Sequence, residues 1–263
     1  MAGAGVLLIL VLFAGLIVGG ITWACRAAKR RRQALAALAK ELGLTFTFRD
    51  PTAIEGHRPD PGPLAGLLEE YLERAFAGMM RPGWSGLAGD LGRFEALAAG
   101  DTRRASNVLH GRRHGRELSA FDYRYGIGSG VSRRTPRLSA AIAACNCSFP
   151  ELLIRPEGLL DKLAGAVGSE DINFESHEFS KQFHVACADR KFAYAVIHAQ
   201  MMEFLQGCPG WSLEMDGEDV VIWSGSRWSP EQFRSAIAVL EGFLDRIPRY
   251  LWKDLGPRGA GGG

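Results

Sequence analysis

Residues 107–125 read NVLHGRRHGRELSAFDYRY, and this stretch decides the fold class. Two runs with strand character, 107–111 and 117–125, flank a polar turn at 112–116, which predicts a β-hairpin. In the second run aromatic side chains occupy alternate positions, so the aromatic side is predicted to face the core. A chain organised around hairpins favours an antiparallel sheet over a parallel one.

Short strands and helices are predicted on both sides of this hairpin. Asp216-Gly217, between 211–215 and 219–223, predicts a second hairpin. Ser229, Pro230 and Gln232 form a capping box with proline at the first helical position. Further strands are predicted at 44–48, 138–149, 152–154, 172–174 and 179–188. Helices are predicted at 27–42, 64–76, 156–165, 191–205 and 230–247.

The order of these elements predicts an α+β domain, in which a largely antiparallel sheet carries helices packed on one side. No glycine-rich turn leads from a strand into a helix, which argues against a doubly wound parallel fold. The sequence divides into an anchor at 1–25, a juxtamembrane helix at 26–43, the α+β domain at 44–255 and a glycine-rich tail at 256–263 that is expected to be disordered.

The anchor is predicted from residues 5–23, GVLLILVLFAGLIVGGITW, which carry no charge. As a helix this run nearly spans a hydrocarbon core of roughly 30 Å, so a single transmembrane helix is predicted. A cleaved signal peptide needs a basic region before the apolar run, and no basic residue precedes Arg26. Gly15 and Gly19 form a pair of small residues that would allow close helix contact, but ordinary glycine content in a lipid-facing helix is the favoured interpretation.

Five basic residues directly follow the apolar run. Positive residues stay in the cytoplasm, so the N-terminus is predicted outside and the domain at the cytoplasmic face of the cell membrane. Five cysteines form a sparse, odd set that agrees with a reducing compartment. Contact with anionic lipid headgroups is an additional role for the basic residues, which topology alone already explains. They are Arg26, Lys29, Arg30, Arg31 and Arg32.

The net charge of +2 conceals a basic middle, because residues 101–137 carry a net +6 between two acidic parts. A nucleic-acid-binding domain is usually basic throughout, so nucleic acid is not a predicted partner. If the turns of this stretch share one end of the sheet, they form a cationic rim. A solvated rim with no specific role is the favoured interpretation, and contact with anionic lipid is the alternative. The rim arginines are Arg103, Arg104, Arg112, Arg113, Arg116, Arg133, Arg134 and Arg137.

Cys145 and Cys147 lie two apart in a predicted strand, so both thiols should point to one face. A zinc site needs two more ligands at a suitable spacing, which the sequence lacks, and buried structural cysteines are predicted instead. His110 and His114 fall beside arginines in the predicted hairpin, where neighbouring cations disfavour a metal.

His177 lies in an acidic stretch, with Glu170, Asp171, Glu175 and Glu178, but in no order typical of a cation-binding loop. No nucleophile, metalloprotease, phosphate-loop or kinase motif is present, and residues 126–130 (GIGSG) are predicted as a flexible loop. No catalytic residue, cofactor or metal ligand is therefore predicted.

Three stretches, GRRHGRELSAFDYRY at 111–125, PELLIRPE at 150–157 and DINFESHEFSKQFHV at 171–185, resemble an uncharacterised family of bacterial membrane-anchored proteins, a domain of unknown function. The resemblance covers residues 27–250 and rests on aromatic and structural positions. It implies a bacterial single-span protein with a cytoplasmic domain, and it transfers no active-site residue.

Three functional hypotheses follow. The favoured one is a non-enzymatic interaction or scaffold module at the cytoplasmic face, motivated by the anchor, the basic rim and the missing catalytic motifs. The second is a membrane-associated enzyme, with polar groups converging around Asp171, His177 and His184. The third is a periplasmic or extracellular envelope domain. No protein partner is identified by the sequence.

Overall fold

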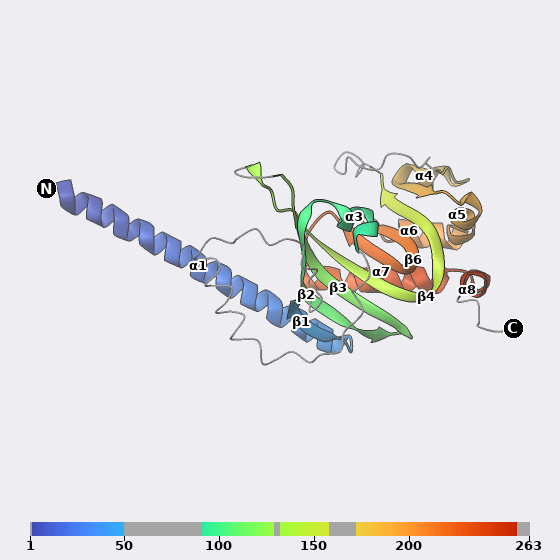
Figure 1. Ribbon diagram of the computed structural model, residues 1–263, viewed down its shortest axis with the longest axis horizontal. Helices are drawn as coiled ribbons and strands as arrows, with labels where there is room; N and C mark the ends of the chain where they lie inside the picture. The colour runs from blue at the N-terminus through green and yellow to red at the C-terminus, as the bar shows by residue number, and fades with distance from the viewer. Residues whose placement is uncertain (1, 50–90, 129–131, 158–171, 257–263) are drawn as a thin grey trace.

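The computed structural model describes residues 2–49, 91–128, 132–157 and 172–256 (Figure 1). They form an α+β domain with a long N-terminal helix, which confirms the predicted fold class in outline. The helices are α1 (Ala2–Glu41), η2 (Leu91–Arg93), α3 (Glu95–Ala98), α4 (His177–Gln182), α5 (Arg190–Val196), α6 (Ala199–Gln206), α7 (Pro230–Arg246) and α8 (Arg249–Leu255). The strands are β1 (Thr45–Arg49), β2 (Asp101–Arg113), β3 (Arg116–Gly126), β4 (Arg137–Pro156), β5 (Phe183–Cys187) and β6 (Ser212–Ser224).

Helix α1 is continuous and joins the predicted anchor to the predicted juxtamembrane helix. Its 40 residues give a length of about 60 Å, and its N-terminal part projects well beyond the domain (Figure 1). The C-terminal part belongs to the domain, because Leu35, Leu38 and Ala39 are buried in the core. Gly43 follows with a φ of +70°, the left-handed conformation that ends many helices.

None of the helices in the described ranges combines the length and the apolar character that crossing a membrane requires. The transmembrane helix predicted at 5–23 therefore has no support from the structure, and it remains a prediction from the sequence.

The described strands form one sheet in which every pair is antiparallel, in the order β1-β2-β3-β4-β5, with β6 also paired to β4. Strand β4 is the centre of the sheet. Its first half pairs with β3, its second half pairs with β5, and β6 runs along its opposite edge. The predicted hairpin at 107–125 is confirmed as β2 and β3, although both strands are longer than the sequence indicated.

Both faces of the sheet are buried. Ala120 of β3 faces the larger core, which α1 and α7 cover, whereas Phe121 and Tyr123 face a second core that includes Phe94 and Leu97 of the α3 region. The aromatic side of β3 is core, as predicted. The expectation that helices pack on one side is wrong. Alternate apolar residues of β3 point to opposite faces of the sheet, so other parts of the chain must cover both faces.

The hairpin predicted at Asp216-Gly217 is also wrong. Strand β6 runs through this site, and both of its halves pair with β4, with register shifts around the Phe149–Gly217 pair. Gly217 has a φ of +56°, so the glycine accommodates an irregularity within the strand instead of a turn. A glycine with positive φ is common at both kinds of site, which is why the dipeptide alone misleads.

Two other segments differ from the sequence-based expectation. The strand predicted at 179–188 is divided, because Ser176 caps α4 and the strand β5 begins only at Phe183. The helix predicted at 191–205 is broken into α5 and α6, and His198 caps the second of these. The predicted capping box at Ser229 and Gln232 is confirmed at the start of α7.

Several predictions lie outside the described residues. These are the helix at 64–76, the helix at 156–165 beyond Glu157, and the tail after Gly256.

Candidate functional site

The point where α1 leaves the domain brings together the basic residues that the sequence singled out. Arg26, Lys29 and Arg30 are exposed on α1, so they are available to a partner. Arg31 and Arg32 are only partly exposed, because their side chains engage the domain. The five predicted lipid-contact residues therefore divide into three that face solvent and two that attach α1 to the sheet.

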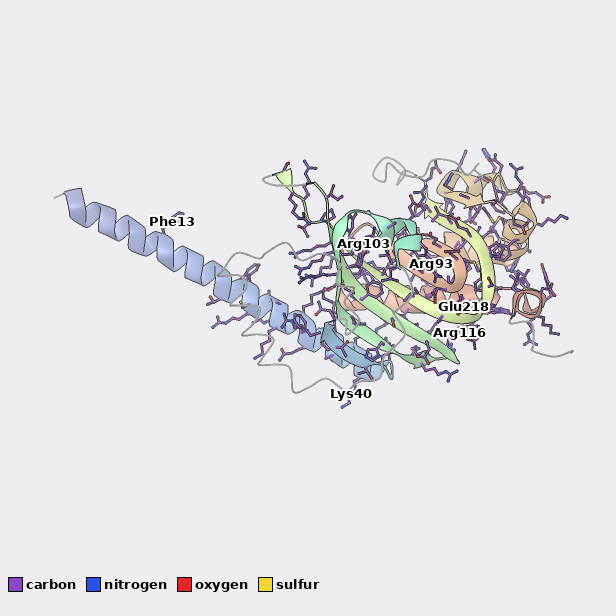
Figure 2. All side chains as sticks on the ribbon, in the orientation of Figure 1. Phe13, Lys40, Arg93, Arg103, Arg116 and Glu218 are labelled. Carbon is purple, nitrogen blue, oxygen red and sulfur yellow. The ribbon has the colours of Figure 1, made fainter. Side chains whose placement is uncertain are left out.

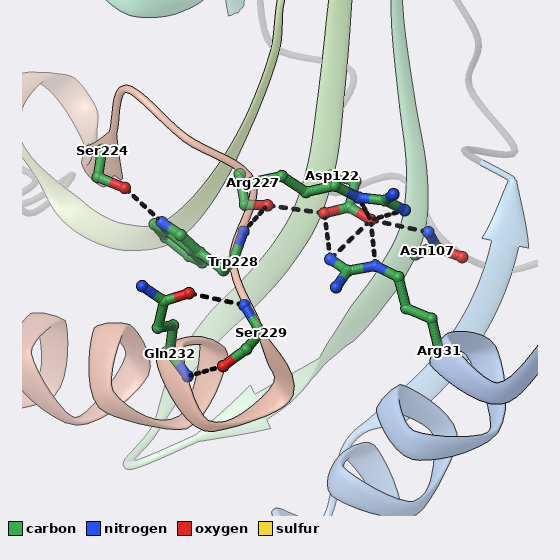
Figure 3. Close-up of polar contacts among 9 residues, drawn as sticks. Arg31, Asn107, Asp122, Ser224, Arg227, Trp228, Ser229 and Gln232 are labelled. Atoms are coloured by element: carbon green, nitrogen blue, oxygen red, sulfur yellow. Dashed lines mark hydrogen bonds and ion pairs between the residues drawn. The ribbon is translucent and has the colours of Figure 1, made fainter. Parts of the chain in front are cut away.

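Asp122 on β3 is the centre of this attachment (Figure 3). Its buried carboxylate accepts hydrogen bonds from Arg31 Nη2 at 2.8 Å and from Arg227 Nη2 at 2.9 Å. Ser139 Oγ donates at 2.7 Å and Asn107 Nδ2 at 2.8 Å. Two arginines from distant elements thus meet on one carboxylate that the sheet holds in place.

The surroundings of Asp122 keep it ionised. Burial alone would raise the pKa of Asp122, but hydrogen bonds from Arg227, Arg31, Ser139 and Asn107 together hold that pKa below its ordinary value. Asn107 reaches the carboxylate from an irregular part of β2, where the register shifts and the residue adopts a φ of 52°. Asparagine tolerates this conformation better than most residues.

Three further contacts fasten the C-terminal part of α1. The Arg32 guanidinium lies 3.5 Å from the centre of the Phe48 ring on β1, and burial lowers the pKa of Arg32. Arg113 donates to the Leu42 carbonyl and forms an ion pair with Glu241 of α7 at 2.7 Å. Another ion pair joins Arg234 of α7 to Glu41. Helix α1 is therefore fixed to β1, β2, β3 and α7.

The basic stretch 101–137 does not form one rim. Its arginines gather at opposite ends of the sheet, as Arg103 and Arg116 show in Figure 2. At the β2–β3 turn the arginines are paired within the domain, to Glu117, Glu241 and Asp245. At the other end lie Arg103, Arg104, Arg133, Arg134 and Arg137, together with Arg124 of β3.

Cys145 and Cys147 lie on one face of β4, as predicted, and both are free and buried in the larger core. The hydrogen bond between the two thiols raises the pKa of Cys145 and lowers that of Cys147. Within the described part of the chain, no three His, Cys, Asp or Glu side chains are grouped as a metal site. A hollow of about 450 Å³ beside Cys147 is lined also by Asn146, Ser148, Glu218 and Asp254.

The histidines are dispersed. His110 is on β2, where burial lowers its pKa, and His114 is in the β2–β3 turn with a φ of 48°. His177 begins α4 and borders a shallow hollow formed by that helix alone, whereas His184 is on β5. Asp171 and Glu170 lie outside the described residues. Among the residues that the structure describes, no complete set of polar groups gathers around His177.

Sequence reasoning missed a buried polar cluster on the second face of the sheet. Arg155 Nη1 donates to Glu95 Oε1 at 2.7 Å, and Glu214 accepts the Glu95 backbone N–H at 3.0 Å. Arg155 and Glu214 are almost completely buried. The available signal was the presence of a charged residue inside an apolar strand, as in the run LLIRP at 152–156.

No protein-family model matches this chain, and no curated protein sequence matches it. Among solved structures, the mycobacterial trehalose monomycolate transport factor A, TtfA, is similar to it, with a TM-score of 0.52 at 13% sequence identity. The similarity covers 87% of this chain and 96% of the TtfA chain. At this identity the comparison shows a shared fold, and the family resemblance inferred from sequence remains a prediction.

Proposed function

We propose that this protein is a non-enzymatic interaction or scaffold module, held at the cytoplasmic face of a membrane by the N-terminal part of α1. The observation that carries the proposal is the construction of α1 itself. One end of the helix is part of the domain core, and the other is an uncharged arm that projects from it (Figure 1).

The exposed side chains of the arm support insertion into lipid. Phe13 is 64% exposed and Trp23 is 74% exposed. Exposed large apolar side chains on a protruding helix favour an apolar environment, and a bilayer supplies one along the whole uncharged run. Trp23 lies at the end of that run, next to Arg26, where aromatic side chains favour the membrane interface.

The fastening of α1 supports a positioning role. Arg31, Arg32, Arg113 and Arg234 bind the helix to several elements, so a domain attached in this way is held at a fixed distance and angle from the arm. A flexible tether would serve an enzyme that only needs a local substrate supply. A rigid support suits a protein that presents a surface to a partner.

The similarity to TtfA supports an accessory form of this role. That protein is a transport factor for trehalose monomycolate, and this chain shares its fold over most of both chains. We therefore propose an accessory role in a membrane process, with the partner of this chain left unassigned.

The membrane part of the proposal is tested by cell fractionation. We expect the full chain to remain with membranes after alkaline carbonate extraction. The double substitution Phe13→Arg with Gly15→Arg should release it, because each charge at the centre of a span costs about 2.5–3.5 kcal/mol. The matched control is Gln33→Arg with Ala37→Arg, which adds two arginines at exposed positions of α1 outside the apolar run.

The side of the membrane is tested by protease treatment of spheroplasts. Protection of the domain in intact spheroplasts and digestion after lysis would support the cytoplasmic assignment. Digestion in intact spheroplasts would favour the envelope domain instead. Release of the unaltered chain by carbonate would overturn the anchor.

A further inference from the structure

The end of the sheet from which the α1 arm departs carries a row of arginines set by strand register. Arg124 of β3 lies directly opposite Arg104 of β2 on one side and Arg137 of β4 on the other. All three are exposed. This row therefore concentrates exposed positive charge at one end of the sheet.

The face of the sheet on which this row lies is the face that α1 crosses. Arg124 has the same parity on β3 as Asp122, which Arg31 of α1 contacts. The row therefore lies one pair of residues closer to the end of the sheet than the attachment point of α1. Arg26, Lys29 and Arg30 continue the exposed positive charge along the helix itself.

An exposed apolar side chain lies at the same end of the sheet. After β3, Ile127 forms a bridge with Arg134, with both backbone N–H···O distances at 2.9 Å. Ile127 is 47% exposed, and Arg133 and Arg134 accompany it. The segment projects toward the side on which the N-terminal arm of α1 lies (Figure 1). An exposed apolar side chain among cations is typical of a surface that contacts anionic membranes.

The opposite end of the sheet, at the β2–β3 turn, carries Arg112, Arg113 and Arg116, which form ion pairs with Glu117, Glu241 and Asp245. Only the end beside the arm combines exposed cations in register with an exposed isoleucine, within the described residues.

We propose that this end of the domain docks on an anionic lipid bilayer, with Ile127 in the interface and the arginines against lipid phosphates. The proposal rests on the membrane anchoring proposed above and adds a second attachment. The arm holds the chain in the membrane, and the docking surface, formed by Arg104, Arg124, Ile127, Arg133, Arg134 and Arg137, fixes which side of the domain faces the lipid.

The test uses the full chain reconstituted into vesicles of phosphatidylcholine, with or without roughly 30% phosphatidylglycerol. A fluorophore is attached at Ile127→Cys in a background with the accessible Cys25 and Cys208 replaced by serine. We expect lipids with a headgroup nitroxide to quench this fluorophore several-fold more in the anionic vesicles. The same label at His114→Cys, in the β2–β3 turn, should remain unquenched in both vesicles.

Charge substitutions test the cause. Arg133→Glu with Arg134→Glu should reduce quenching at position 127 to the level found in neutral vesicles, whereas Arg112→Glu should not. Raised salt should weaken the contact. Equal quenching at positions 127 and 114, or quenching that does not depend on phosphatidylglycerol, would overturn the docking.

Flotation of the vesicles separates this proposal from the one on which it rests. A chain that floats with lipid after carbonate treatment but shows no quenching at position 127 refutes the docking alone. A chain that does not float refutes the anchor, and the docking with it.

Discussion

Glu214 illustrates how burial on the second face of the sheet sets the protonation state of a single residue. The side chain is 1% exposed, and burial raises its pKa to about 8, with the carboxylates of Glu95, Glu151 and Asp216 acting in the same direction. The backbone N–H of Glu95 partly offsets this shift. The carboxyl group is therefore protonated in the folded protein at pH values at which an exposed glutamate is ionised.

This shift predicts the pH dependence of stability. The contribution of Glu214 is complete below its unfolded pKa of about 4.3 and is lost as the pH rises through about 8, at up to about 1.4 kcal/mol per unit. Glu214→Gln keeps an acceptor for the Glu95 N–H and cannot ionise. We expect it to unfold in urea with a flatter pH dependence than the unaltered protein, and to be the more stable of the two near pH 8.

The exposed Glu203→Gln on α6 is the matched control, and it should leave the pH dependence unchanged. The interpretation is wrong if Glu214→Gln and the unaltered protein lose stability in parallel over this range.

At the scale of elements, β6 depends on one glycine. Gly217 adopts a φ of +56° where β6 shifts register against β4, and ion pairs from Arg93 to Asp216 and Asp219 lie beside it. The strand can continue through the irregularity because glycine enters the left-handed region without steric cost. The same property made the site resemble a turn in the sequence.

Gly217→Ala is expected to destabilise the domain by about 1–2 kcal/mol, because a Cβ atom is strained at this φ. Gly217→Asn should cost less, since asparagine tolerates the left-handed conformation. The measurement is the urea midpoint. Gly225→Ala is the control, because an added Cβ there meets nothing within 4 Å. Equal midpoints for the two alanine variants would contradict the strained conformation.

At the scale of the whole molecule, Asp122 joins parts of the chain that are far apart in sequence. It binds α1 through Arg31 and the segment before α7 through Arg227, while β3 carries it and Ser139 of β4 supports it (Figure 3). The charged carboxylate therefore adds to the core packing by which α1 is held to the domain.

Asp122→Asn should lower the free energy of unfolding by about 1.5–3 kcal/mol, because it weakens the charge-assisted hydrogen bonds from two partly exposed arginines, Arg31 and Arg227. Hydrogen exchange of α1 near Arg31 should accelerate in the same variant. Asp245→Asn removes an exposed partner of Arg116 and should change stability by no more than about 0.5 kcal/mol. Similar losses in the two variants would show that Asp122 is not the central attachment.

The features that the sequence predicted correctly are local. The helix at 27–42, the β2–β3 hairpin and the capping box at Ser229 all follow from interactions within a few residues. The sequence also showed the basic cluster after the apolar run. It did not show that three of these residues face solvent and that two contact the domain.

Only the tertiary structure decided which of those cations face solvent, and which strand lies opposite which. The arginine row, the Asp122 attachment, the unbroken β6 and the second buried face depend on the register between strands distant in sequence. Register is set by the burial of whole faces at once, since a shift of one residue turns every side chain to the other side. No short stretch of the chain contains that information.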